Sequence, residues 1–179
     1  MTTAERHEYA AALVTAGRPG VVLELGCGPG ALLELLADRL PEARLVGVDR
    51  SATALERAGR RLTGLAAAGR VTLLRSTVAA LELPARSVDA AVAVDVNLFW
   101  TGAATAELAV LGRVLRPGGV LYLVVAPPAP NPRVRAGTED ALARAGWTTT
   151  AVIEAGGLVT VSAGIGAAST RARAPRGRA

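Results

Sequence analysis

Short apolar runs alternate along the chain with segments whose apolar residues follow a helical spacing. The runs are rich in Val, Leu and Ala and are almost continuous, as strands buried on both faces of a parallel sheet require. They predict strands at residues 21–25, 44–48, 71–75, 88–94 and 120–125. The helical spacing predicts helices at residues 2–16, 30–40, 52–62, 101–115 and 138–146.

Two more strands are predicted near the carboxyl end, at residues 148–153 and 158–163. The short connection Ala155-Gly156-Gly157 joins them as a hairpin, so they pair antiparallel. The whole pattern predicts a Rossmann-like, doubly wound α/β fold with a mostly parallel seven-stranded sheet and an antiparallel C-terminal hairpin. Residues 1–165 are expected to form one domain, and residues 166–179 a disordered basic tail.

A glycine-rich turn follows the first strand, in the stretch E-L-G-C-G-P-G that spans residues 24–30. Glycine accepts positive φ and has no Cβ, so this backbone can turn sharply and approach a ligand closely. The helix that follows leaves free N–H groups at its start, which favour an anionic or nucleotide ligand. Glu24 precedes the turn, and its carboxylate is expected to attract an ammonium group. Cys27 is expected to be a small side chain near the ligand and not a nucleophile.

Asp49 ends the second strand, about 20 residues after the glycine turn, and Arg50 follows it. An acid at this place suits a nucleotide ribose, because its two oxygens can accept both ribose hydroxyls. Capping of the next helix by Asp49 or Ser51 is the structural alternative. The acid before the glycines favours S-adenosylmethionine, but these features do not exclude NAD, since Gly26, Gly28 and Ala31 also match the G-x-G-x-x-A form of the dinucleotide turn.

The fourth strand ends in D-V-N-L-F-W, residues 95–100. Ligands of open α/β sheets lie at the carboxyl ends of the strands, so this segment is the second candidate site. Asp95 and Asn97 are candidates to hold or polarise a substrate. Phe99 and Trp100 are candidates for an aromatic wall, with packing in the core as the alternative. From the leading helix, Tyr9 is a further candidate for contact with a substrate, as is the chain's one histidine, His7.

Two strings together resemble the class I S-adenosylmethionine-dependent methyltransferases. E-L-G-C-G-P-G is similar to their first motif, and G-R-V-L-R-P-G-G, residues 112–119, is similar to a signature of the small-molecule ubiquinone/menaquinone-type (methyltransferase type 11) members. The resemblance covers residues 20–163 and implies S-adenosyl-L-methionine as cofactor and methyl transfer to a small molecule. The segment Ser76-Thr77-Val78 stands where the family often has Gly-Asp-Ala, so Thr77 replaces the acid. The cofactor-binding residues are therefore expected to be Glu24, Gly26, Cys27, Gly28, Gly30, Asp49, Arg50, Thr77, Val78 and Asp95.

Two alternatives to an active methyltransferase stay open. Thr77 and the short chain, which has no insertion to form a lid, favour a non-catalytic S-adenosylmethionine-binding member. An NAD-dependent oxidoreductase is less well supported, because a Tyr-x-x-x-Lys relay is excluded in a chain without lysine. The acceptor pocket must come from the leading helix, the end of the fourth strand and the Pro-rich loop 126–132, or from a second subunit in a homodimer.

The composition excludes several classes of partner. Four of the 20 arginines lie in the last nine residues, so residues 1–170 hold 16 arginines against 15 acids and offer no basic face for nucleic acid. No apolar run is long enough to span a membrane, and the polar start is unlike a signal peptide. The lone cysteine fits a cytoplasmic protein. No spaced His/Cys set predicts a metal, and the loop A-P-P-A-P has no Asp or Asn for a catechol-type metal site.

Overall fold

The computed structural model describes residues 1–129 and 131–165, so the predicted tail 166–179 lies outside the described residues. Its core is a seven-stranded sheet of order β3-β2-β1-β4-β5-β7-β6. β1 to β5 are parallel, and β7 runs antiparallel to both β5 and β6. The predicted fold is confirmed. The strands are β1 (Val21–Leu25), β2 (Arg44–Asp49), β3 (Val71–Arg75), β4 (Val88–Val94), β5 (Leu115–Val125), β6 (Trp147–Ala155) and β7 (Leu158–Ile165).

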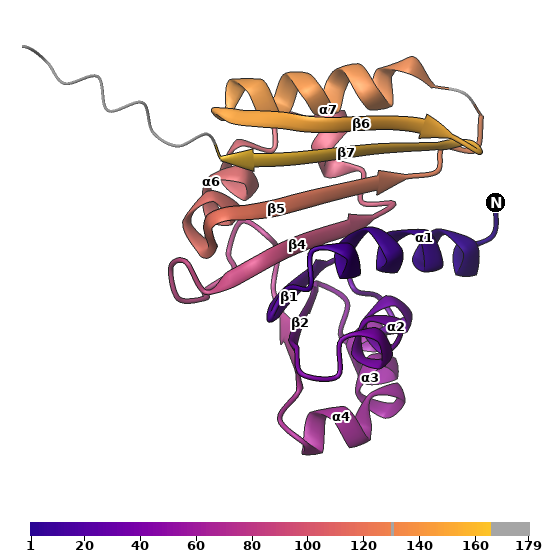
Figure 1. Ribbon diagram of the computed structural model, residues 1–179, viewed down its shortest axis with the longest axis vertical. Coiled ribbons are helices and arrows are strands. Elements are labelled where there is room, and N and C mark those ends of the chain that lie inside the picture. Colours follow the sequence, from indigo (N-terminus) through magenta and orange to yellow (C-terminus); the bar gives the residue numbers. More distant parts are fainter. Residues whose placement is uncertain (130, 166–179) are drawn as a thin grey trace, which may run out of the picture.

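One face of the sheet is covered by α1 (Thr3–Ala16), α2 (Ala31–Arg39) and α3 (Ala52–Arg61). In Figure 1, α1 runs beside β4 while α2 and α3 lie over the β1–β2 part of the sheet. Thr2 and Glu5 form a capping box that fixes the start of α1: Thr2 Oγ1 accepts from the Glu5 amide, and the Thr2 amide donates to the Glu5 carboxylate. A short helix, α4 (Thr63–Ala67), follows α3 and was not predicted.

The other face is covered by α5 (Leu98–Thr101), α6 (Thr105–Val114) and α7 (Pro132–Arg144). The prediction of one helix over 101–115 was wrong. Gly102 is extended and Ala104 has a φ of 46°, so the chain breaks between two helices. The break lets α5 lie directly against α7, where a Cβ on Gly137 would come within 2.7 Å of the Trp100 carbonyl oxygen.

Two other boundaries differ from the prediction. α7 begins at Pro132 rather than at residue 138, because the Asn131 side chain accepts from the Arg133 amide and caps the helix. β5 begins at Leu115 rather than at residue 120. Its first residues pair with β4 through a register shift between Val88 and Ala90, so the R-P-G-G string lies inside an irregular strand.

The carboxyl ends of the five parallel strands share one edge of the sheet. The turn between β6 and β7 and the start of α1 lie toward the same edge, on the right in Figure 1. β1 pairs with both β2 and β4, so the strand order reverses beside the glycine turn that follows β1. Ligands of open α/β sheets bind at such a reversal, and this edge carries the candidate site.

Candidate functional site

The glycine turn after β1 is tied to the end of β2. The amides of Gly26 and Cys27 both donate to the Val48 carbonyl, at 2.8 and 3.0 Å. Gly26, Gly28 and Gly30 have φ values of 67°, 52° and 79°, which favour glycine over any residue with a side chain. A Cβ on Gly30 would lie 2.9 Å from Leu62 Cδ1, whereas one on Gly28 would meet no atom within 4 Å. The turn therefore packs against α3 at Gly30 and opens at Gly28.

Asp49 joins the end of β2 to this turn. Its Oδ2 accepts from the Gly28 amide at 2.9 Å, and its Oδ1 accepts from the Ser51 amide at 2.9 Å. Ser51, and not Asp49, caps α3, through its hydroxyl and the Ala54 amide. Each carboxylate oxygen has two acceptor sites, so Asp49 keeps one on each oxygen for a ligand hydroxyl.

A cavity of about 330 Å³ opens beside Asp49. We call it the donor cavity. It brings together six of the residues that the sequence proposed, from four separate segments: Gly26, Asp49, Arg50, Thr77, Val78 and Asn97. The others that line it were not proposed: Val48, Ser76, Val96, Leu98 and Glu107. Thr77 Oγ1 accepts from the Ala80 amide at 3.3 Å, so its hydroxyl shapes the turn after β3.

Glu24 does not line the donor cavity. It is 3% exposed on β1, and its Oε2 is buried with no hydrogen-bond partner among the described residues. Burial raises the pKa of Glu24 well above its usual value of 4.5. A hydrogen bond from the Leu33 amide, in the first turn of α2, lowers the pKa, and the negative charge of Asp49 raises it further. Glu24 is therefore a buried acid behind the glycine turn, in contact with the start of α2.

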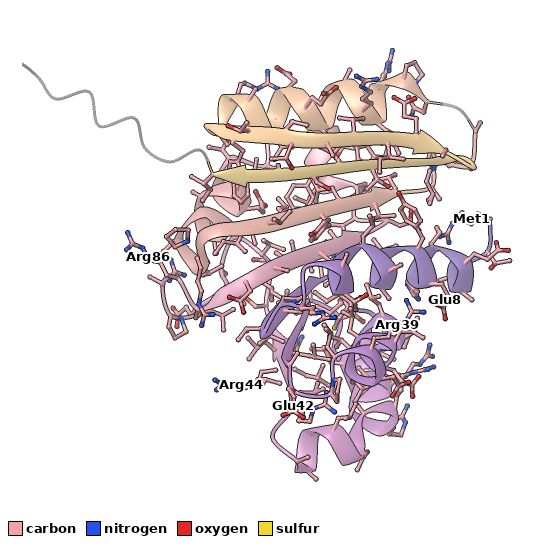
Figure 2. All side chains as sticks on the ribbon, in the orientation of Figure 1. Met1, Glu8, Arg39, Glu42, Arg44 and Arg86 are labelled. Atoms are coloured by element: carbon pink, nitrogen blue, oxygen red, sulfur yellow. The ribbon has the colours of Figure 1, made fainter. Side chains whose placement is uncertain are left out.

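Replacing Glu24 with Gln should make stability less dependent on pH. Because the pKa is raised in the folded state, Glu24 contributes to the free energy of unfolding in full below its unfolded-state pKa. This contribution is lost as the pH rises through the folded-state pKa. The advantage of the wild type over Glu24→Gln should therefore fall across this window by about 1.4 kcal/mol per pH unit. Urea unfolding between about pH 4.5 and 8 measures it. The exposed Glu42→Gln (Figure 2) is the control, and a constant difference would contradict the assignment.

Cys27 is 4% exposed within the turn. Burial, together with the nearby Glu24 and Asp49, raises the pKa of its thiol to about 12. The thiol stays protonated at neutral pH, and thiols react as nucleophiles only in the thiolate form. A Cβ on Gly47 of β2 would lie 2.9 Å from Cys27 Sγ, so the side chain fills space between the turn and the sheet.

Asp95 follows β4 and joins three elements. Its amide donates to the Val124 carbonyl at 2.8 Å, and its Oδ1 accepts from the Ala126 amide at 2.8 Å, which ties the ends of β4 and β5. Its Oδ2 lies 3.0 Å from Arg6 Nε, which adds α1. Asp95 has a φ of 55°, a costly conformation for this residue that these contacts hold in place.

A second cavity, of about 730 Å³, opens on the other side of this junction. We call it the distal cavity. Arg6 and Ala126, the two partners of the Asp95 side chain, both line it. Val96, the residue after Asp95, lines the donor cavity. The rest of the wall of the distal cavity comes from Met1, the loop 127–129, the start of α7 (Asn131, Pro132, Arg135) and residues 154–159 of the β6–β7 hairpin. Asp95 lines neither cavity itself and lies between residues of the two linings.

The proposed aromatic residues line neither cavity. Phe99 is 2% exposed and packs in the core with residues of α6 and β4, which is the structural alternative that the sequence left open. Trp100 is half-buried against α7, with its Nε1 buried and without a partner among the described residues. Tyr9 packs partly buried on the α1 face of the sheet. Burial, with Arg6 next in effect, lowers the pKa of His7.

The donor cavity fits an adenosine-containing ligand. Asp49 lines it with a carboxylate that keeps free acceptor sites, and Gly26 lines it with the backbone of the glycine turn. Gly28, which Asp49 binds, lies outside the lining, and a Cβ there would meet no atom within 4 Å. The cavity volume of about 330 Å³ lies within the usual range for ligand pockets. Residues 1–129 and 131–165 contain no group of three or more His, Cys, Asp or Glu that could hold a metal ion. No helix in those residues is long and apolar enough to cross a bilayer.

Comparison with known proteins decides between the cofactors that the turn allows. A family model described as a methyltransferase domain matches residues 22–119. The chain belongs to the class I S-adenosylmethionine-dependent methyltransferase family. Residues 26–107, which include every residue that lines the donor cavity, lie inside the match. The prediction of S-adenosylmethionine over NAD is therefore confirmed at the level of the family.

The chain is also similar to individual proteins. It is 35% identical over 127 residues to a trans-aconitate 2-methyltransferase of Paracidovorax citrulli, a match that covers 70% of the chain and 46% of the relative. The chain thus spans about half the length of that curated relative. A crystal structure of a SAM-dependent methyltransferase from Aquifex aeolicus has a TM-score of 0.75 at 20% identity and covers 92% of this chain and 94% of the other. A possible exported protein from Bordetella parapertussis has a TM-score of 0.72 at 26% identity, covering 89% and 66%.

Proposed function

We propose that this methyltransferase moves a methyl group from S-adenosylmethionine, bound in the donor cavity, to a small molecule bound in the distal cavity. The observation that carries the proposal is the place of Asp95 between two cavities at the carboxyl edge of the sheet. Its partners Arg6 and Ala126 line the distal cavity, and its neighbour Val96 lines the donor cavity. A transfer between two bound molecules requires such an arrangement, because the reacting atoms must be held a few ångströms apart.

In this proposal the walls of the donor cavity hold the cofactor. The free acceptor sites of Asp49 bind the ribose hydroxyls, Thr77 and Val78 contact the base, and the backbone of Gly26 to Gly28 faces the amino acid part. The sulfonium supplies an already activated methyl group. The chain holds the two reactants in position and excludes water from them. These two effects account for much of the catalysis when no bond in the protein is made or broken.

The relatives suggest a first acceptor to try. Several of them carry the name trans-aconitate 2-methyltransferase, so we include this acid among the first compounds. A carboxylate acceptor is ionised near pH 7, so its methylation asks no side chain to remove a proton. That Asp95 and Asn97 hold or polarise the acceptor stays a prediction: Asn97 lines the donor cavity, and Asp95 would act through its pair with Arg6. A homodimer, a cytoplasmic location and a single domain over residues 1–165 stay predictions.

Calorimetry with S-adenosylhomocysteine and with NADH tests the donor half of the proposal. We expect S-adenosylhomocysteine to bind with a Kd of about 1–100 µM, or roughly −8 to −5 kcal/mol, and NADH not to bind. Transfer of a labelled methyl group to an acceptor panel then tests turnover. A folded protein that binds no S-adenosylhomocysteine would refute the proposal. Binding without transfer to any compound of a broad panel would favour the non-catalytic alternative.

A further inference from the structure

The distal cavity has two arginines on its walls, from two helices at opposite ends of the described chain. Arg6 belongs to α1 and Arg135 to α7. Most of the remaining wall is Ala, Pro, Gly, Leu and Val, so these guanidinium groups are its strongest hydrogen-bond donors. The two arginines differ in how completely acidic side chains of the protein already neutralise their charge.

Arg135 is occupied. Its Nε donates to Glu139 Oε2 at 2.9 Å and its Nη1 donates to Glu154 Oε1 at 3.1 Å, and its side chain is 50% exposed. Two carboxylates therefore already balance its charge, and solvent competes for the rest. A ligand would gain little from this residue.

Arg6 is different, because its side chain is only 19% exposed and its charge is poorly matched. Its Nε lies 3.0 Å from Asp95 Oδ2, yet this buried atom makes no hydrogen bond, so the two groups attract without good alignment. Its Nη2 donates to Thr3 Oγ1 at 2.9 Å. A guanidinium carries five N–H donors, so most of them remain for a ligand.

Asp95 can release Arg6 without losing its other contacts. Its Oδ1 is held by the Ala126 amide, and only Oδ2 faces the arginine. The Asp95 side chain is 36% exposed, and partly exposed ion pairs contribute little to stability because water solvates the separated charges. The capping box at Thr2 and Glu5 fixes the first turn of α1, so Arg6 stays at the cavity whichever partner it binds.

We propose that Arg6 is the acceptor-recognition residue of the distal cavity, and that it binds a carboxylate of a small organic acid by exchanging Asp95 for it. The planar fork of a guanidinium matches a carboxylate in a two-bond arrangement that the present Nε–Asp95 pair does not reach. The ligand class is thus a small mono- or polycarboxylate. This inference rests on the proposed function for the role of the cavity, but the binding it describes is measured without turnover.

The test is binding of acids to protein saturated with S-adenosylhomocysteine, measured by calorimetry. The probes are acetate, succinate, citrate and trans-aconitate, with their methyl esters and inorganic phosphate as comparisons. We expect at least one acid to bind with a Kd below about 1 mM, its ester and phosphate not to bind, and Arg6→Gln to weaken the acid about tenfold or more. Arg133→Gln, which removes an exposed arginine of α7 outside the cavity lining, is the matched control and should change nothing.

The variant Asp95→Asn tests whether a ligand carboxylate replaces Asp95 as the partner of Arg6, or whether Arg6 only supports the structure. The variant's amide oxygen can still accept from Ala126, while the charge that competes for Arg6 is gone. The acid should therefore bind about threefold or more tightly in this variant, opposite to the effect of Arg6→Gln. If S-adenosylhomocysteine binds but no acid does, or if Arg6→Gln binds acids as well as the wild type, the inference is wrong and the donor proposal stands. A wild-type protein that is folded but does not bind S-adenosylhomocysteine would instead refute the proposed function.

Discussion

Asp49→Ala should lower the affinity for S-adenosylhomocysteine by about 100-fold or more while leaving a folded protein. Two hydrogen bonds from ligand hydroxyls to a charged acceptor contribute about 1.5–3 kcal/mol each, and each 1.4 kcal/mol is a factor of ten. The substitution also frees the Gly28 and Ser51 amides, both now bound to this carboxylate at 2.9 Å. The turn then loses the contact that holds Gly28 toward the end of β2.

Calorimetry and circular dichroism on the same sample distinguish a lost contact from a lost fold. Stability should fall by only about 1–2 kcal/mol, because both freed amides lie where water can reach them. Asp38→Ala, which removes an exposed acid from α2, is the matched control and should bind S-adenosylhomocysteine as the wild type does. Unchanged affinity in Asp49→Ala would show that this carboxylate serves only the loop and would move the ribose contact elsewhere.

Phe99→Ala should lower the free energy of unfolding by about 3–5 kcal/mol, since it opens a cavity in a packed core. Phe99 is 2% exposed and lies among the largest fully buried side chains. Its neighbours in the core come from α6, α7, β4 and β5, which are held in place by many other contacts and cannot collapse to fill the space. A loss of this size is a large part of the stability of a domain of this length.

Urea unfolding measures the effect, with Ile153→Ala as the control. Ile153 is a large apolar side chain on β6 that is 42% exposed, so its truncation should cost less than about 1 kcal/mol. In Phe99→Ala at low temperature, where the protein stays folded, the Kd for S-adenosylhomocysteine should lie within about threefold of the wild type. Unchanged stability with a loss of methyl transfer would instead make Phe99 part of the acceptor wall.

Most of the sheet could be predicted because its signals are local. The continuous apolar strands, the glycine turn and Asp49 each report their own position, and parallel strands bring their carboxyl ends to one edge. The errors came where a local signal was weak or misread. The pair Asn131-Pro132 starts a helix where the Pro-rich composition predicts a loop. The break at 102–104 contains one glycine in an otherwise helical composition.

The distal cavity is lined in part by the leading helix and the loop 126–132, which the sequence proposed for the acceptor pocket. The pair of charged residues beside it could not be predicted, because its members are far apart in the sequence. Arg6 and Asp95 are 89 positions apart, and nothing near either residue marks them as partners. The burial of Glu24 and Phe99 also could not be predicted from their own stretches of sequence. Each stands beside a strand end where a ligand residue is expected, yet Glu24 lies behind the glycine turn and Phe99 lies in the core.

The walls of the two cavities come from separate stretches of the chain. Every residue that lines the donor cavity falls between positions 26 and 107, and every one that lines the distal cavity falls at positions 1–6 or 126–159. Only the first stretch lies within the part that the family model matches. Under the proposed function, substitutions in the segments that line the distal cavity would change the acceptor without removing the residues that hold the methyl donor. Exchange of those segments between related methyltransferases is the corresponding route for engineering.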